Sequence, residues 1–266
     1  MRIYMVRISP DGEKAALGVS RPDGTDVHLL DLSSGEFERF TFDSPMEDGP
    51  VWHPDGTRIA FNSDWVGGGS RIFVKEVRSG VAPEPLFTGD HHIHLSDWSP
   101  DGRWIAFDYI VSRQGKDVYA LEVDNPPNLI PVANSTEQEG GGVFSQDGEW
   151  IAYEWEEEVF VAPFPPTGAK DQVSTSGGSG PRWIPGTGEL SYWKGDTLMV
   201  TKVSTDGGFE RGPPEPLFVF PGRGTYFDVS PDGQTFLIAA RNPDARTFEI
   251  HMVRNWFEVL KEAEGG

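Results

Sequence analysis

Residues 99–107 read Ser-Pro-Asp-Gly-Arg-Trp-Ile-Ala-Phe, a short turn followed by the start of an alternating strand. Proline presets φ near −65° and glycine accepts a positive φ, so Pro-Asp-Gly reverses the chain at low conformational cost. Copies of the turn stand at 9–12, 53–56, 145–148 and 230–233, with a degenerate copy at 184–188. Their closing glycines, Gly12, Gly56, Gly102, Gly148, Gly188 and Gly233, are 44, 46, 46, 40 and 45 residues apart. This spacing divides the chain into six units.

Each unit carries the same flanks around its turn. A strand with period-two alternation follows the turn, as at 58–63, 104–108 and 150–154. Most units then add a third strand, as at 70–77 and 116–123, and a shorter fourth, as at 84–87. Four strands in about 40–45 residues match one blade of a propeller. A bulky apolar residue precedes each turn and is expected between blades: Ile8, Trp52, Trp98, Phe144, Trp183 and Val229.

The repeat predicts an all-β fold, a six-bladed β-propeller of four-stranded antiparallel blades. One four-stranded sheet cannot bury both of its faces, whereas a closed ring of sheets buries them against one another. We expect a single domain over 1–266, with blades at about 1–44, 45–90, 91–136, 137–176, 177–221 and 222–255.

The sixth unit shows only three strands and then a tail. We expect a short C-terminal helix at about 255–263, which Asn255 can cap and whose Trp256, Phe257 and Leu260 share one face, to cover the outer edge of this blade. Alternatively, residues upstream in a longer polypeptide complete the blade.

Composition narrows the classes of partner. The chain has 22 Lys and Arg against 42 Asp and Glu, a net charge of −20, which repels phosphate backbones and anionic lipids. It has no cysteine, so disulfides, zinc-thiolate sites and cysteine nucleophiles are excluded. No apolar run approaches 18 residues, and the start lacks a signal-peptide pattern. We expect no nucleic-acid partner and no direct membrane insertion. We also expect a monomer, and the composition is compatible with more than one cellular compartment.

The turn and the Ile-Ala-Phe strand that follows it resemble the WD40-like propeller repeat of TolB-type proteins, over residues 1 to about 254. True WD40 repeats carry Gly-His and Trp-Asp signatures, which these units lack. Residues 220–229 and 249–261 are similar to the tail of bacterial TolB-like propellers, which stand alone or follow a serine/threonine kinase domain and a membrane segment. The resemblance implies that the chain is a sensing or docking module. If it is the C-terminal part of a membrane-anchored, kinase-like protein, the resemblance implies that it is extracytoplasmic. The kinase motifs are missing from the sequence, so kinase activity does not carry over.

A histidine cluster offers the sharpest chemistry. His91, His92 and His94 lie on the segment entering the innermost strand of the third unit, with Asp97 just beyond. Neutral imidazoles at this spacing can share a metal, and metal-dependent lyases that resemble TolB use channel histidines. The alternative function is therefore a metal-dependent lyase or hydrolase centred on these three residues. No other unit obviously donates a histidine to that mouth, so we favour a solvated loop without a metal.

No other catalytic arrangement emerges. Ser179 lacks the strand-to-helix elbow of a nucleophilic serine, Gly140-Gly141-Gly142 is expected to be a loop between strands, and the repeated aspartates are explained by their turns. We therefore predict a non-catalytic module without a cofactor, which binds a protein segment or a small ligand at one mouth of the central channel. The predicted contacts at that mouth are Asp48, His92, His94, Asp97, Glu139, Arg182, Arg223 and Tyr226.

Overall fold

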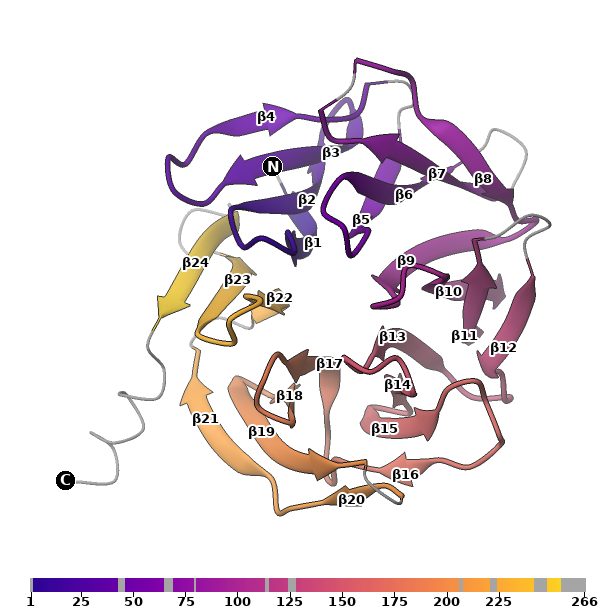
Figure 1. The fold of residues 1–266 in the computed structure, drawn as a ribbon, viewed down its shortest axis with the longest axis vertical. Coiled ribbons are helices and arrows are strands. Elements are labelled where there is room, and N and C mark those ends of the chain that lie inside the picture. The colour runs from indigo at the N-terminus through magenta and orange to yellow at the C-terminus, as the bar shows by residue number, and fades with distance from the viewer. Residues whose placement is uncertain are drawn as a thin grey trace.

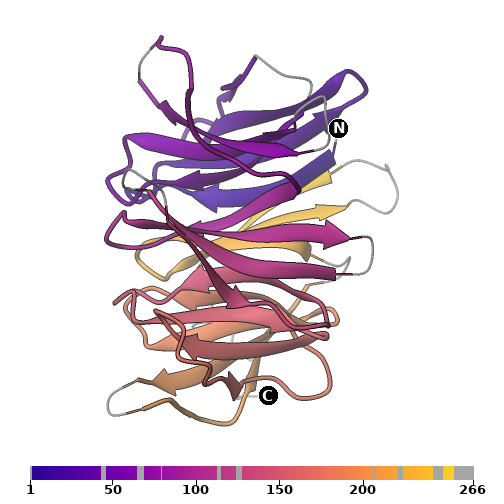
Figure 2. The same ribbon diagram turned by 90° about the vertical axis from the view of Figure 1, so that its right-hand side faces the viewer.

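The protein is a closed ring of six antiparallel sheets around a central axis, as the computed structural model shows (Figure 1). The structure describes residues 2–42, 46–64, 69–78, 80–112, 115–123, 128–205, 208–220, 224–241 and 248–254. Each sheet runs from the axis to the rim (Figure 1), and the side view shows that the sheets are twisted (Figure 2). The predicted all-β, six-bladed propeller is confirmed.

The first four blades have four strands each, which follow the chain from the axis outward. Blade one comprises β1 (Arg2–Ile8), β2 (Lys14–Arg21), β3 (Gly24–Asp31) and β4 (Phe37–Arg39). Blade two comprises β5 (Glu47–Trp52), β6 (Arg58–Asp64), β7 (Ser70–Glu76) and β8 (Glu84–Thr88). Blade three comprises β9 (His92–Trp98), β10 (Trp104–Ser112), β11 (Gly115–Glu122) and β12 (Leu129–Ala133). Blade four comprises β13 (Glu139–Phe144), β14 (Trp150–Trp155), β15 (Glu158–Pro163) and β16 (Asp171–Gln172).

The last two blades depart from this pattern at their outer edges. Blade five comprises β17 (Ser179–Ile184), β18 (Glu189–Lys194) and β19 (Thr197–Ser204), whose outer edge is shared by β20 (Glu210–Arg211) and β21 (Glu215–Val219). In the part of blade six that the structure describes, β22 (Gly224–Val229), β23 (Thr235–Arg241) and β24 (Phe248–Arg254) form a three-stranded sheet. The predicted C-terminal helix lies outside the described residues. In the described part of the chain, no helix is long and apolar enough to cross a membrane.

The recurring turns owe their shape to local hydrogen bonds. In blade three, Ser99 Oγ donates to Asp101 Oδ1 at 2.6 Å, and the N–H of Arg103 donates to the same oxygen at 3.0 Å. The N–H of Gly102 reaches the Ser99 carbonyl at 2.9 Å, with the φ of Gly102 at +75°. These bonds confirm that the repeated aspartates hold their turns, because the carboxylate satisfies backbone N–H groups that the reversal exposes.

The core lies at the junctions between blades. Trp52 packs on Ala16, Val27 and Leu29 of blade one, and its Nε1–H donates to the Arg7 carbonyl at 3.0 Å. Five of the six apolar residues before the turns are buried, as predicted, and Trp183 is half-buried against the core between blades four and five. Along each second strand, alternate side chains face opposite neighbours, so every blade is buried on both faces. Contacts between β1 and β22 close the ring.

Candidate functional site: the axial channel

Two connected hollows lie along the axis of the ring. The larger one, which we name the wide chamber, has a volume of about 610 Å³ and lies where the innermost strands begin. The smaller one, the turn-side chamber, measures about 350 Å³ and lies beside the Pro-Asp-Gly turns. Arg7 and Arg182 line both hollows, so these two side chains separate them. The fold thus creates a channel with a charged constriction.

The pairing of each innermost strand with its second strand is interrupted. Every one of β1, β5, β9, β13, β17 and β22 has a register shift against its second strand. In three of them a glycine with positive φ occupies the bulge, namely Gly49 at +61°, Gly141 at +68° and Gly180 at +60°. A bulge leaves a backbone N–H without its ladder partner, which another group must satisfy. The predicted loop at 140–142 is wrong, because these glycines form the bulged part of β13.

At two of these bulges, an acidic side chain on the second strand of the preceding blade accepts the free backbone N–H. Asp108 on β10 accepts the N–H of Gly141 through Oδ1 at 2.7 Å, and Glu154 on β14 accepts the N–H of Gly180 through Oε1 at 2.8 Å. Both carboxylates line the wide chamber. Burial raises the pKa of Glu154, although the Gly180 N–H and nearby Lys116 oppose the shift. The carboxylates therefore join adjacent blades and also bring negative charge to the chamber wall.

Lys116 supplies the opposite charge on the same wall. Its Nζ lies 3.1 Å from Asp108 Oδ2 at the hairpin that connects β10 and β11. Burial lowers the pKa of Lys116, but the neighbouring Asp108 and Glu154 outweigh it, so the pKa lies above its ordinary value. Lysine consequently stays charged in the chamber, where its three donors can serve both the protein and a ligand.

Six residues, one from each innermost strand, line the turn-side chamber, and we name them the belt. Each directly precedes the apolar residue of its unit. Burial and Arg182 lower the pKa of Arg7 to about 9, while Asp228 and Asp97 oppose them. Burial raises the pKa of Asp97 to about 6, against the effects of Arg7 and the Phe144 N–H, which it accepts at 2.8 Å. The belt consists of Arg7, Val51, Asp97, Val143, Arg182 and Asp228.

The predicted site residues divide into three groups. His92, His94, Arg182 and Tyr226 line the wide chamber. Asp97 and Arg182 line the turn-side chamber. Asp48 and Glu139 are enclosed in the wall of the ring, and Arg223 lies outside the described residues.

Asp48 accepts the N–H of Gly49 at 2.7 Å, and burial raises its pKa while His94 and His92 oppose the shift. Glu139, which is 2% exposed, accepts the N–H of Ser135 at 3.1 Å.

The three histidines do not converge. His92 Nδ1 donates to Asp64 Oδ1 at 2.8 Å, and this hydrogen bond raises the pKa of His92 despite its burial. His91 instead lies against the ring of Tyr109, with centroids 5.2 Å apart, and its side chain is 41% exposed. Only His92 and His94 of the three line the wide chamber. Within the described ranges, no three His, Asp or Glu side chains are placed to share a metal ion.

Sequence reasoning missed five charged residues of the channel. Arg7 and Asp228 occupy the belt, and Asp108, Lys116 and Glu154 line the wide chamber. A signal for two of them was present, because Ile-Ala-Phe at 105–107 and Ile-Ala-Tyr at 151–153 are each followed by an acidic residue. An acidic side chain at a recurring position of a buried strand needs a polar partner, which the next blade provides.

Comparison with known proteins identifies related folds. Residues 5–161, more than half of the chain, match the family described as the TolB beta propeller domain. A TolB-like protein from Agrobacterium tumefaciens has a similar structure, with 21% identity, a TM-score of 0.70 and 87% coverage of both chains. TolB from Acinetobacter baumannii is also 21% identical, with a TM-score of 0.62 over 80% of this chain and 54% of that one. Thus this chain spans about half the length of the Acinetobacter protein.

An oligogalacturonate lyase in complex with manganese has a similar fold as well. It is 14% identical, with a TM-score of 0.62 over 94% of this chain and 76% of the lyase. At this identity the likeness shows the architecture alone, since one fold hosts unrelated functions.

Proposed function

The chain belongs to the TolB beta-propeller domain family, and on that premise we propose that it is a non-catalytic binding module whose wide chamber receives a polar segment of a protein partner. The proposal goes beyond the fold to one place on it. It assigns recognition to the end of the channel opposite the Pro-Asp-Gly turns.

One observation carries the proposal, the convergence of side chains of both charges on the wide chamber. Lys116, Arg182 and Glu154 reach it from three different blades, within a hollow of about 610 Å³. That volume lies in the range of ligand pockets, which use a few convergent polar groups to orient what they bind. Asp108 pairs with Lys116, so the wall is charged without carrying a large net charge. Such a wall favours a partner segment that offers both donors and acceptors.

The arrangement supports binding better than bond-breaking chemistry. One oxygen of Asp108 and one of Glu154 each accept a backbone N–H of the neighbouring blade, which fixes the orientation of both carboxylates. His92 is held by Asp64 on the wall. These fixed groups are suited to bind a polar partner segment. No specific observation on the described residues favours the metal-dependent alternative.

Selection from a random peptide library on the immobilised chain tests the proposal. Enriched peptides are then measured by titration calorimetry against the unmodified chain and against Lys116→Gln and His92→Gln. We expect each substitution to weaken binding by about tenfold, or ~1.4 kcal/mol. Arg103→Gln is the matched control, because Arg103 pairs with Glu122 on the outside of blade three. Equal affinity for all four proteins would contradict the assignment to the wide chamber.

A further inference from the structure

In blades two to four, one recurring position faces the junction with the following blade. It is the second residue after the closing glycine of the turn, which is Arg58 in blade two, Trp104 in blade three and Trp150 in blade four. The ring of Trp104 packs edge-on against Phe164 of blade four, with centroids 5.3 Å apart. The ring of Trp150 contacts Phe209 of blade five at 5.8 Å. At two successive junctions, therefore, an indole fills this place.

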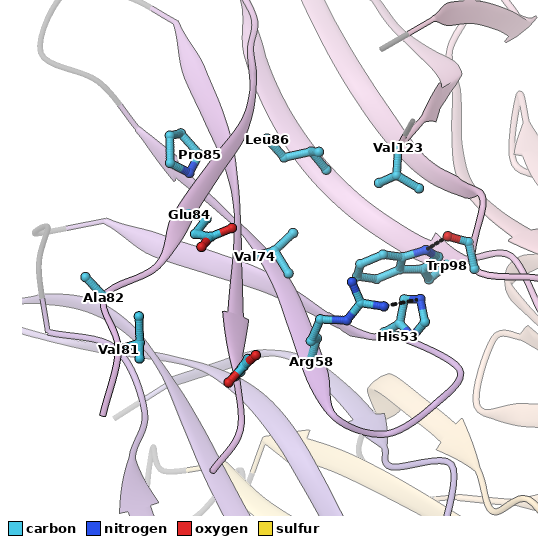
Figure 3. A pocket seen from close by; sticks show the side chains of 12 residues that line it. His53, Arg58, Val74, Val81, Ala82, Glu84, Pro85, Leu86, Trp98 and Val123 are labelled. Atoms are coloured by element: carbon cyan, nitrogen blue, oxygen red, sulfur yellow. Dashed lines mark hydrogen bonds between the residues drawn. The ribbon is translucent and has the colours of Figure 1, made fainter. Parts of the chain in front are cut away.

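The junction between blades two and three has no such indole. Arg58 Nη2 donates to His53 Nε2 at 2.8 Å and lies 3.3 Å from Asp55 Oδ2, so the guanidinium is held toward the turn of its own blade. A hollow of about 490 Å³ remains, which we name the junction pocket (Figure 3). Its lining comprises His53, Arg58, Val74, Glu76, Val81, Ala82, Glu84, Pro85, Leu86, Trp98, Gly102 and Val123.

The inner wall of the junction pocket is suited to an aromatic ring. Val74, Leu86 and Val123 provide aliphatic surface around the indole of Trp98 (Figure 3). The Nε1–H of Trp98 donates to the Gly102 carbonyl at 3.0 Å, so the polar edge of this indole is already satisfied. Aromatic rings pair favourably at centroid separations of about 4.5–7 Å, worth ~0.5–1.5 kcal/mol beyond their buried area.

The rim adds a preference for charge. Glu76 and Glu84 line the pocket, within a chain of net charge −20. The positive charge of Arg58 is opposed by Asp55 at the inner end. Val81, on the same rim, is 61% exposed, which offers apolar surface at the opening. A basic group beside the ring would lie near the rim carboxylates.

We propose that the junction pocket binds an aromatic side chain of a protein partner that is flanked by basic residues. The ring enters between Trp98 and the aliphatic wall, in the place that Trp104 and Trp150 occupy at the next two junctions. This site lies off the axis, so it is independent of the wide chamber and of the function proposed for it.

The test uses a defined probe, the peptide acetyl-Lys-Trp-Lys-amide, and follows the indole Nε1–H resonance of Trp98 by NMR, assigned with Trp98→Phe. We expect a saturable shift at millimolar probe, as befits a single anchor. The peptide acetyl-Lys-Ala-Lys-amide should leave the resonance in place, and acetyl-Glu-Trp-Glu-amide should bind several-fold more weakly.

The decisive variant is Arg58→Trp, which supplies the missing indole from within the chain. It should abolish the probe-induced shift, while Arg58→Lys, which leaves the pocket open, should retain it. If Arg58→Trp fails to fold, Val81→Ser serves instead, because it removes apolar surface at the opening without changing the charge of the rim, and it should weaken binding of the Lys-Trp-Lys peptide several-fold. The proposal is overturned if the Lys-Trp-Lys peptide leaves the Trp98 resonance of the unmodified chain in place or if the alanine peptide shifts it equally. It is also overturned if the shift is unchanged in folded Arg58→Trp or, failing that, in folded Val81→Ser.

Discussion

Asp228 on the last blade accepts the backbone N–H of Ile8 on the first blade through Oδ2 at 2.7 Å, and its Oδ1 lies 3.6 Å from Nε of Arg182. One carboxylate therefore joins the two ends of the ring and neutralises a guanidinium of the channel. Asp97 has the same geometry toward Phe144, so the bond recurs three blades away. The junction that closes the propeller uses the same chemistry as an internal one.

Replacing Asp228 tests how much this bond contributes. We expect Asp228→Ala to lower the free energy of unfolding by ~2–3 kcal/mol, because it leaves the Ile8 N–H without its acceptor and removes the carboxylate that pairs with Arg182. Asp228→Asn keeps an acceptor of the same shape and should lose less than half of that. Urea denaturation at neutral pH measures both, and equal losses for the two variants would show that the hydrogen bond is unimportant.

Asp97 should give the channel an unusual pH dependence. Its pKa is raised from 3.8 to about 6 in the folded state, mainly by burial. The folded protein therefore holds the proton more tightly than the unfolded chain between these values, so stability falls as pH rises through this window. The difference corresponds to ~3 kcal/mol.

Asp97→Asn removes this titration and retains an acceptor for the Phe144 N–H. We subtract the unfolding free energy of this variant from that of the unmodified chain. This difference should fall by ~3 kcal/mol from pH 3.5 to pH 7, because only the unmodified chain loses stability as Asp97 ionises. Denaturation at several pH values measures it. A difference that does not depend on pH would mean that Asp97 titrates normally.

His92 should titrate above the ordinary value of 6.5, because its hydrogen bond to Asp64 raises its pKa more than burial lowers it. Asp64→Asn should bring the pKa of His92 down. The stability gained from this pair is present below the unfolded-state pKa and is lost as pH rises through the folded-state pKa. NMR titration of the imidazole protons, assigned with His92→Gln, reports the shift; an unchanged pKa in the Asp64 variant would refute this coupling.

Gly49 should tolerate no side chain. Its φ is +61°, and a Cβ there would meet Asn62 Oδ1 and lie 3.2 Å from the backbone nitrogen of Leu95. We expect Gly49→Ala to cost ~3 kcal/mol, from the left-handed backbone and the clash together. Gly35 has φ +75° with open space around it, so Gly35→Ala isolates the backbone effect at ~1 kcal/mol. Similar costs measured by urea denaturation would show that the bulge of β5 can shift.

The sequence predicted the ring because its turns are encoded locally. Gly102 and its counterparts need a positive φ, and Asp101 and its counterparts need their own backbone N–H groups, so spacing alone marks the blades. At the outer edge of blade five, the strand at 215–218 was predictable and the additional short strand β20 was not. Its fourth strand is divided between β20 and β21, and such short pairings depend on packing more than on local pattern.

The channel was harder to predict because its side chains act across blade boundaries. Asp108 occurs in an ordinary strand pattern, and its charge is explained by the bulge at Gly141 in the next blade and by its ion pair with Lys116. Arg7 precedes an apolar residue like any inner-strand position, yet it becomes the buried cation of the constriction. For His91 the sequence was misleading. Its closeness to His92 and His94 in the sequence suggested a cluster of three, but its ring lies against Tyr109 instead.

The belt has a consequence for how a guest is oriented. Read around the axis, its members are Arg7, Val51, Asp97, Val143, Arg182 and Asp228. No rotation by a multiple of 60° superimposes this order on itself, although the backbone that carries it is nearly sixfold. A molecule bound on the axis therefore contacts different side chains in each of its six orientations about that axis. One orientation can then have the lowest free energy, although the backbone around it is nearly sixfold symmetric.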